Sequence, residues 1–265
     1  MLIGHEKLTE TFKHLAQGDR LSHGYLFFGE PNIGKFSFAM GLAAYLETGE
    51  FREPSRPLGE TTVIRPDDEG TIGISSIREA KYFLTQKPVY SSRRVIIIDE
   101  AEKLTLQAQH AILIMAEEPP PAGLIILVVS NQEALLPTIQ SRLQKIYFPR
   151  VSSGLISTFL IKQFKISQRE AAEISKISFG RPGRAIKIAN SKSQIAKKKN
   201  KKELIEAMTE SNEAMQENFT ELIAELAKDP VQNYAELKSI LNRLRLISQF
   251  NTNKRLQLES ALWNI

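Results

Sequence analysis

The residues with the clearest chemical potential form a short loop near the amino terminus. The segment from Gly29 to Lys35 reads GEPNIGK, which has the G-x-x-x-x-G-K spacing of a Walker A phosphate-binding loop. Glycines at these positions let backbone N–H groups wrap around phosphate oxygens, and the lysine neutralises the charge of the β- and γ-phosphates. Gly29, Gly34 and Lys35 are therefore candidate nucleotide-binding residues.

The residue after this lysine departs from the motif. A Walker A loop has Ser or Thr there, whose hydroxyl binds Mg²⁺, whereas this chain has Phe36, which offers no metal ligand. Ser37 follows, but one residue rotates a helix by about 100°, so its hydroxyl points elsewhere. Two interpretations stay open: a loop that binds nucleotide, or a degenerate loop kept as architecture. Hydrolysis is less favoured, because Mg²⁺ normally bridges and neutralises the phosphates.

A second candidate group follows the hydrophobic run Val95–Ile98. The run ends in Asp99 and Glu100, which is the Walker B pattern. Asp99 would hold the Mg²⁺ shell, and Glu100 would polarise the attacking water. The alternative is that both acids are only the N-terminal charges of the next helix.

Three further polar residues stand beside expected strands or at the start of an expected helix. Asn131 follows the apolar run Leu124–Val129, at the end of an expected strand beside the γ-phosphate position. Arg142 precedes the run Lys145–Phe148, and Arg184 lies in the turn GRPGR just before an expected helix. Alone, an arginine in a loop is most often a surface charge.

The elements expected to position these residues alternate between strands and helices over residues 1–150. Unbroken aliphatic runs separated by helical patterns indicate an α/β domain with a parallel sheet covered on both faces. The expected strands are Tyr25–Phe28, Thr61–Arg65, Arg94–Ile98, Leu124–Val129 and Lys145–Phe148.

Local signals mark where the helices of this domain begin and end. Gly18 and Gly49 are expected stops for the first two helices. Ser76 with Glu79 forms a capping box that should open the third helix, and Thr105 can cap the fourth.

After Pro149 the strand signal disappears. A helix over Ser152–Lys165, a second opened by the Ser167/Glu170 capping box and a third after Pro182 predict a small helical lid over residues 151–190. Residues 191–265 are expected to form a third, all-helical domain with apolar stripes that suit a bundle or an assembly face.

Composition narrows the class of protein. The 265 residues carry a net charge of +5, too mild to establish a nucleic-acid partner, and they include no cysteine. Disulfides, thiolate zinc sites, iron–sulfur clusters and a cysteine nucleophile are thereby excluded.

There is no signal peptide and no apolar run of the ~20 residues that span a bilayer, which predicts a cytoplasmic protein without membrane contact. Gly49–Glu60 should be an exposed connection, and the lysine-rich run 197–202 a solvated segment.

Taken in order, these segments resemble the AAA+ subunits of bacterial sliding-clamp loaders over about residues 1–190. The resemblance rests on several runs: IGHE at 3–6, HGYLF at 23–27, IDEAEKL at 98–104, AIL at 111–113, EEPP at 117–120, SN at 130–131 and LLPTIQSR at 135–142. The run GRPGRA at 180–185 favours the delta-prime type of DNA polymerase III subunit over the gamma/tau type.

The resemblance implies a P-loop domain, a helical lid and a C-terminal collar that assembles a pentamer. It implies that Asn131 is the sensor-1 residue, Arg184 the sensor-2 residue, and Arg142 an arginine finger that reaches a neighbouring subunit's ATP. The implied partners are gamma/tau and delta subunits, the sliding clamp, and primed DNA contacted through its backbone phosphates. Relatives that carry four cysteines hold zinc between the phosphate loop and the next strand; here that stretch has none, so no zinc is expected.

The leading hypothesis is therefore a clamp-loader subunit that weakly binds or ignores nucleotide and supplies Arg142 to a neighbour. ATP with Mg²⁺ remains the cofactor to consider, although Phe36 argues against the metal. A second hypothesis is an active gamma/tau-like ATPase that uses Lys35, Asp99 and Glu100. A third is a DNA-remodelling AAA+ ATPase outside replication.

Overall fold

The computed structural model describes residues 2–197 of the chain. Two compact units divide the chain, Met1–Lys187 and Ile188–Ile265. The elements below belong to the first unit, apart from the end of the last helix. Residues 198–265, which include most of the predicted collar at 191–265 and most of the lysine-rich run, lie outside the described residues.

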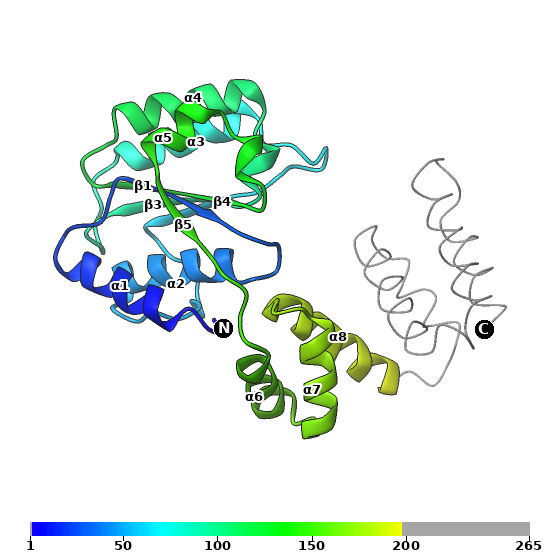
Figure 1. Cartoon of the computed structure of the whole chain (residues 1–265). Helices are drawn as coiled ribbons and strands as arrows, with labels where there is room; N and C mark the ends of the chain where they lie inside the picture. Colours follow the sequence, from blue (N-terminus) through cyan, green and yellow to red (C-terminus); the bar gives the residue numbers. More distant parts are fainter. Residues whose placement is uncertain (1, 198–265) are drawn as a thin grey trace, which may run out of the picture. The chain divides into compact units, whose positions relative to one another are not determined.

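The centre of the first unit is a parallel five-stranded sheet (Figure 1). The order of its strands is β2-β3-β4-β1-β5. Their bounds are β1 Gly24–Phe28, β2 Thr61–Ile64, β3 Arg94–Ile98, β4 Gly123–Val129 and β5 Gln144–Tyr147. All five expected strands are present, with ends that differ by at most one residue. The central β4 is buried along its whole length, whereas β5 at the edge is mostly exposed.

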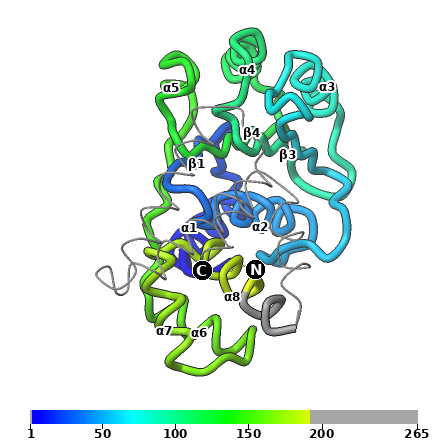
Figure 2. Tube along the Cα trace, turned by 90° about the vertical axis from the view of Figure 1, so that its right-hand side faces the viewer, coloured from blue at the N-terminus to red at the C-terminus, as the bar shows by residue number. Residues whose placement is uncertain are grey.

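Helices cover both faces of this sheet (Figures 1 and 2). One face carries α1 Glu6–Gln17 and α2 Lys35–Thr48; the other carries α3 Ile74–Thr85, α4 Leu106–Glu117 and α5 Pro137–Arg142. Successive strand residues point to opposite faces, so β1, β2, β3 and β4 each contribute to two separate hydrophobic cores. In β3, for example, Ile96 and Ile98 face α3 and α4, while Val95 and Ile97 face α2. This explains why the central strands β1, β3 and β4 are nearly continuous apolar runs rather than alternating.

Short side-chain caps begin several of the helices, as the sequence predicts. The Thr105 hydroxyl accepts a hydrogen bond from the Ala108 N–H at 3.3 Å at the start of α4. The prediction for α3 is wrong: this helix begins at Ile74, after Gly73, and no side chain caps it. The reason is tertiary, because Ile72 forms a parallel bridge to Leu104 and thereby fixes where the chain turns into the helix.

Removing the α4 cap provides a stability test. We expect Thr105→Ala to lower the free energy of unfolding by about 1 kcal/mol, since an N–H group in the first turn loses its acceptor. The matched control is Thr11→Ala, because Thr11 lies exposed within α1 and caps nothing. Urea denaturation should show a loss for the first variant and none for the second; equal losses would contradict the assignment of the cap.

Three helices follow the sheet. They are α6 Ser153–Phe164, α7 Gln168–Ile177 and α8 Pro182–Lys197. The Ser167 hydroxyl accepts a backbone N–H group at the start of α7, as predicted, and the Ser152 hydroxyl does the same at the start of α6. Helices α6 and α7 pack against each other around the buried Ile156, Leu160 and Ile174.

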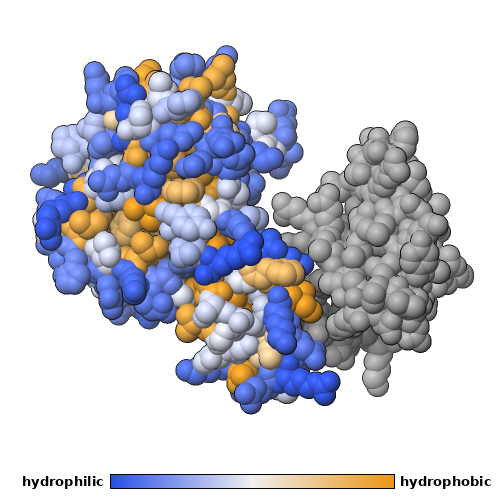
Figure 3. All heavy atoms as spheres, viewed as in Figure 1, coloured by the Kyte–Doolittle hydropathy of each residue, from blue (hydrophilic) through white to orange (hydrophobic). Residues whose placement is uncertain are grey.

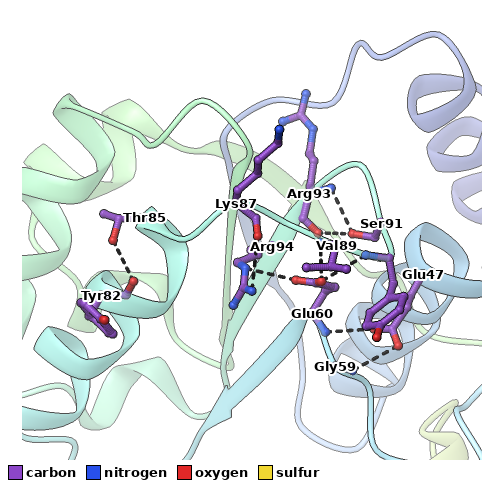
Figure 4. A network of polar contacts seen from close by, with 11 residues as sticks. Glu47, Gly59, Glu60, Tyr82, Thr85, Lys87, Val89, Ser91, Arg93 and Arg94 are labelled. Atoms are coloured by element: carbon purple, nitrogen blue, oxygen red, sulfur yellow. Dashed lines mark hydrogen bonds and ion pairs between the residues drawn. The ribbon is translucent and has the colours of Figure 1, made fainter.

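The exposed connection at 49–60 ends in a buried ionic network (Figure 4). Glu60 is 2% exposed, and one of its carboxylate oxygens lies 3.1 Å from Arg94 Nε. Its other oxygen accepts the N–H groups of Val89 and Tyr90 at 2.6 and 3.2 Å. Glu47 in α2 accepts the N–H of Glu60 at 3.1 Å. The far end of this connection is thus fixed to β3 and to the loop before it.

Hydrophilic residues cover most of the face shown in Figure 3. Within residues 2–197, no helix combines the length and the apolar character that crossing a membrane requires.

Candidate functional site

The loops that follow β1, β3 and β4 meet at the carboxyl-terminal end of the sheet. These strands are neighbours and run parallel, with Phe28 level with Val129 and Ile98 level with Leu127. Their carboxyl ends therefore bring the phosphate loop, Asp99 and Asn131 to the same end of the sheet. In open parallel sheets, ligands bind at the carboxyl ends of the strands.

The backbone path of the phosphate loop needs glycine at positions 29 and 34. Gly29 has φ +143°, and a Cβ atom there would lie 2.6 Å from the carbonyl oxygen of Phe148. Gly34 has φ +107° and directly precedes α2. Both conformations are ones that L side chains rarely adopt. The Walker A spacing thus corresponds to a loop whose backbone requires glycine at both ends.

Lys35 lies buried inside this loop. Its Nζ donates hydrogen bonds to the carbonyl oxygens of Gly29 and Glu30, each at 2.6 Å. Burial lowers the pKa of Lys35 to about 8, against the opposing effect of the nearby carboxylates Glu102, Asp99 and Glu30. The ammonium group is therefore held by backbone oxygens of the loop in which phosphate would lie.

The lowered pKa of Lys35 predicts how stability depends on pH. Between pH 8 and 10.5 the folded chain holds fewer protons at Lys35 than the unfolded chain does, so the cost of burying its charge falls as pH rises. Relative to a Lys35→Met variant, the wild type should gain stability from pH 7.5 to 10. Urea unfolding of both proteins at each pH measures this difference; a difference that stays constant or falls would contradict the burial of a charged lysine.

Asp99 follows β3 and is half-buried. One carboxylate oxygen accepts the N–H of Glu100 at 3.1 Å, and the other lies 3.7 Å from Nε of Arg65. Burial raises the pKa of Asp99, and the Arg65 guanidinium acts against this rise. Glu100 is exposed, with a left-handed backbone at φ +51°.

Glu102 belongs to this cluster, although the sequence did not identify it as a site residue. It lies in the short 3-10 helix η1, Ala101–Lys103, and its Oε1 accepts the N–H of Ser130 at 3.1 Å. It therefore ties the segment after β3 to the end of β4. Its negative charge opposes the lowering of the Lys35 pKa and adds to the rise of the Asp99 pKa. The sequence feature that could have identified Glu102 is its position as a third acidic residue within one helical turn of Asp99.

Asn131 lies at the same end of the sheet, and its side chain bonds a backbone group two residues further along the chain. Its Oδ1 accepts the N–H of Glu133 at 3.0 Å and caps the 3-10 helix η2, Gln132–Ala134.

The first turn of α8 packs against the phosphate loop. The N–H of Gly183 donates to the carbonyl oxygen of Asn32 at 2.8 Å, and a Cβ at position 183 would lie 3.0 Å from that oxygen. Arg184 follows in the same turn, and its guanidinium carbon lies 5.9 Å from the centre of the Phe179 ring. Arg184 is thus on the turn that meets the loop.

Glu30 in the loop forms a second link to the region beyond β5. The Nε atom of Arg150 donates to its Oε1 at 2.7 Å, and Nε of Arg181 lies 3.9 Å from Oε2. The hydrogen bond from Arg150 is the main cause that lowers the pKa of Glu30. Sequence reasoning missed this ion pair, because partners 120 residues apart leave no local signal.

Arg142 lies apart from all these residues. Arg142 ends α5, two residues before β5 begins, so it lies at the amino-terminal end of the strands. Gln144 is level with Tyr25 of β1, and crossing β1 to Gly29 takes four residues at ~3.3 Å each. The Arg142 side chain pairs with Glu117 at 2.6 Å and donates to the Thr138 carbonyl at 3.0 Å.

The residues beside Asp99 do not suit Mg²⁺. Phe36 stands where the motif supplies a hydroxyl ligand, and the guanidinium of Arg65 lies over its ring, with 4.7 Å from Cζ to the ring centre. Because the same guanidinium pairs with Asp99, the carboxylate expected to hold the metal already faces a cation. Among residues 2–197, no group of three or more His, Cys, Asp and Glu side chains could hold a metal ion.

Comparisons with known proteins support the fold described above. In sequence, the chain is 30% identical over 173 residues to the DNA polymerase III subunit gamma/tau of Mycobacterium bovis, covering 59% of this chain and 30% of that protein. The chain thus spans about a third of the length of this relative. In structure, it is similar to a gamma subunit-related protein of DNA polymerase III from Thermotoga maritima, with TM-score 0.56, 21% identity and 96% of both chains covered.

The RuvB Holliday junction branch migration motor of Thermotoga maritima is also similar, with TM-score 0.56, 18% identity, and 88% of this chain and 78% of that one covered. These likenesses establish the AAA+ P-loop fold. The family described as DNA polymerase III, delta subunit matches residues 4–152, more than half of the chain. The chain therefore belongs to the DNA polymerase III delta subunit family.

Proposed function

We propose that this chain is a subunit of the bacterial sliding-clamp loader, of the delta-prime type, and that it supplies Arg142 to the ATP site of a neighbouring subunit. The observation that carries the proposal is the position of Arg142. It lies at the end of the sheet opposite the chain's own phosphate loop, with its side chain partly exposed and accessible to another molecule. The family match and the similarity to gamma/tau subunits support the replication setting.

The chain's own site supports a non-hydrolysing role. Hydrolysis needs a metal beside the phosphates, and Phe36 with Arg65 stands where that metal would be held. Lys35 is engaged by backbone oxygens of its own loop. In this proposal Gly29, Gly34 and Lys35 form the architecture of a nucleotide-type site, and Asp99 and Glu100 are not used to activate water.

The contacts between α8 and the phosphate loop support a fixed arrangement of the lid. The hydrogen bond from Gly183 to Asn32 and the ion pair of Glu30 with Arg181 join the proposed lid, residues 151–190, to the proposed P-loop domain, residues 1–150. Arg184 and Asn131 are the residues that would face a nucleotide in the sensor-2 and sensor-1 positions. A subunit with these links would act as a rigid neighbour for the subunits that hydrolyse ATP.

The proposed partners are gamma/tau and delta subunits, the sliding clamp and primed DNA. Residues 191–265 would form the collar through which the subunits assemble. DNA contact would be made to backbone phosphates, because the described residues contain no base-reading motif.

Reconstitution tests the proposal. A loader assembled from gamma/tau- and delta-type subunits of the source cell should load clamps onto primed DNA only when this chain is added. Loading is measured as retention of labelled clamp on circular primed DNA. Equal loading with and without the chain would contradict the proposed role.

A second candidate is an active ATPase of the gamma/tau type. It is favoured by Lys35, Asp99 and Glu100, which all lie at the carboxyl-terminal end of the sheet, and by the 30% identity to gamma/tau. Single-turnover hydrolysis by the isolated chain separates the two functions. Hydrolysis that depends on Glu100 would favour this candidate over the first.

A further inference from the structure

The side chain of Arg65 lies where the phosphate-loop motif would place a metal. Its Nε is 3.7 Å from a carboxylate oxygen of Asp99, and its Cζ is 4.7 Å from the centre of the Phe36 ring. The register of the sheet creates this proximity: Asp99 donates its N–H to the carbonyl of Ile64, the last residue of β2, at 3.0 Å. The residues that follow β2 and β3 therefore lie side by side.

Phe36 has two consequences for this position. It removes the hydroxyl that binds Mg²⁺ in a Walker A loop. Its ring also gives a flat surface on which a planar, weakly hydrated guanidinium can stack. The loss of the metal ligand and the gain of a partner for Arg65 thus come from the same side chain.

We propose that Arg65 takes the place of the divalent cation in this site, and that the site binds a polyphosphate, such as a nucleoside triphosphate, in its metal-free form. An arginine is always charged and presents several N–H donors in a geometry that suits phosphate oxygens. The side chain of Arg65 is 60% exposed, so it is accessible to a ligand that arrives from solvent.

Lys35 supplies the second positive charge of this site. Its Nζ bonds the carbonyl oxygens of Gly29 and Glu30, which a phosphate entering the loop would replace with its own oxygens. A nucleotide that arrives with Mg²⁺ would instead place two further positive charges beside Arg65. Repulsion between these cations disfavours the metal-bound form.

Equilibrium binding of a fluorescent ATP analogue to the full chain tests this inference. Titrations are made in excess Mg²⁺ and in EDTA. The dissociation constant in EDTA should be no larger than in Mg²⁺. Arg65→Gln should weaken binding in EDTA by about tenfold or more, because a charge-assisted contact to phosphate is lost.

A restoring variant makes the test sharper. Phe36→Thr combined with Arg65→Ala returns the hydroxyl and removes the resident cation, so Mg²⁺ should tighten its binding by at least about tenfold. Arg52→Gln is the matched control, because Arg52 lies beyond the opposite end of α2 and pairs with Glu50 at the surface. Its binding should match the wild type, and thermal melts establish that each variant is folded.

Three outcomes would overturn the inference: wild-type binding that Mg²⁺ tightens about tenfold, no measurable binding in either buffer, or a folded double variant without Mg²⁺ dependence. If the double variant does not fold, the wild-type titrations decide alone. None of these outcomes bears on the proposed clamp-loader role, since that role needs Arg142 and assembly but no nucleotide in this chain.

Discussion

Replacing Arg142 by alanine is expected to abolish most ATP hydrolysis at the neighbouring site that this residue faces. Arginine fingers in GTPases are worth about 10³–10⁵ in rate, because their guanidinium stabilises charge on the transferred phosphoryl group. Clamp-stimulated ATPase of the reconstituted loader measures the effect. Assembly should be unaffected, since Arg142 is exposed and its contacts to Glu117 and Thr138 lie at the surface.

Two further variants separate a finger from a surface charge. Arg142→Lys keeps the charge but loses the planar fork, so it should not restore hydrolysis. Glu117→Gln removes the ion-pair partner of Arg142 and leaves the guanidinium available, so its ATPase should equal or exceed that of the wild type. Unchanged ATPase in the alanine variant would refute the finger assignment.

Breaking the buried pair of Glu60 and Arg94 should cause the largest loss of stability. We expect Glu60→Ala to lower the free energy of unfolding by about 3–5 kcal/mol, because it leaves a buried guanidinium without its partner. The same change also removes the acceptor for the N–H groups of Val89 and Tyr90. Figure 4 shows Val89 and Arg94 beside the Glu60 carboxylate, with dashed lines that mark their contacts to it. Denaturant unfolding measures the loss.

The control for this prediction is an ion pair from the same connection. Glu50 and Arg52 are paired at the surface, so Glu50→Ala should change stability little. The double variant Glu60→Ala/Arg94→Ala should lose less than the sum of its single variants, because the two side chains act as a pair. A loss for Glu60→Ala no greater than that of the control would show that the buried network is not stabilising.

Features set by neighbouring residues could be predicted from the sequence. The five strands are aliphatic runs between turns, and the caps at Thr105, Ser152 and Ser167 depend only on residues three positions ahead. The one wrong cap, at Ser76, failed because the start of α3 depends on the bridge between Ile72 and Leu104.

Contacts across the fold could not be predicted in this way. Arg65 faces Asp99 only because β2 lies beside β3 in a particular register, and no motif contains both residues. Likewise, Gly183 meets Asn32 across 151 positions of sequence. Phe36 was identified as the loss of a metal ligand, but its role as a partner for Arg65 required the structure.

The central claim is that this chain works as one subunit of a mixed loader. Native mass measurement of the complex that copurifies with the tagged full-length chain from its source cell tests it most directly. The expected result is a complex that contains this chain together with gamma/tau- and delta-type subunits. A monomer, or a ring built only from copies of this chain, would contradict the account.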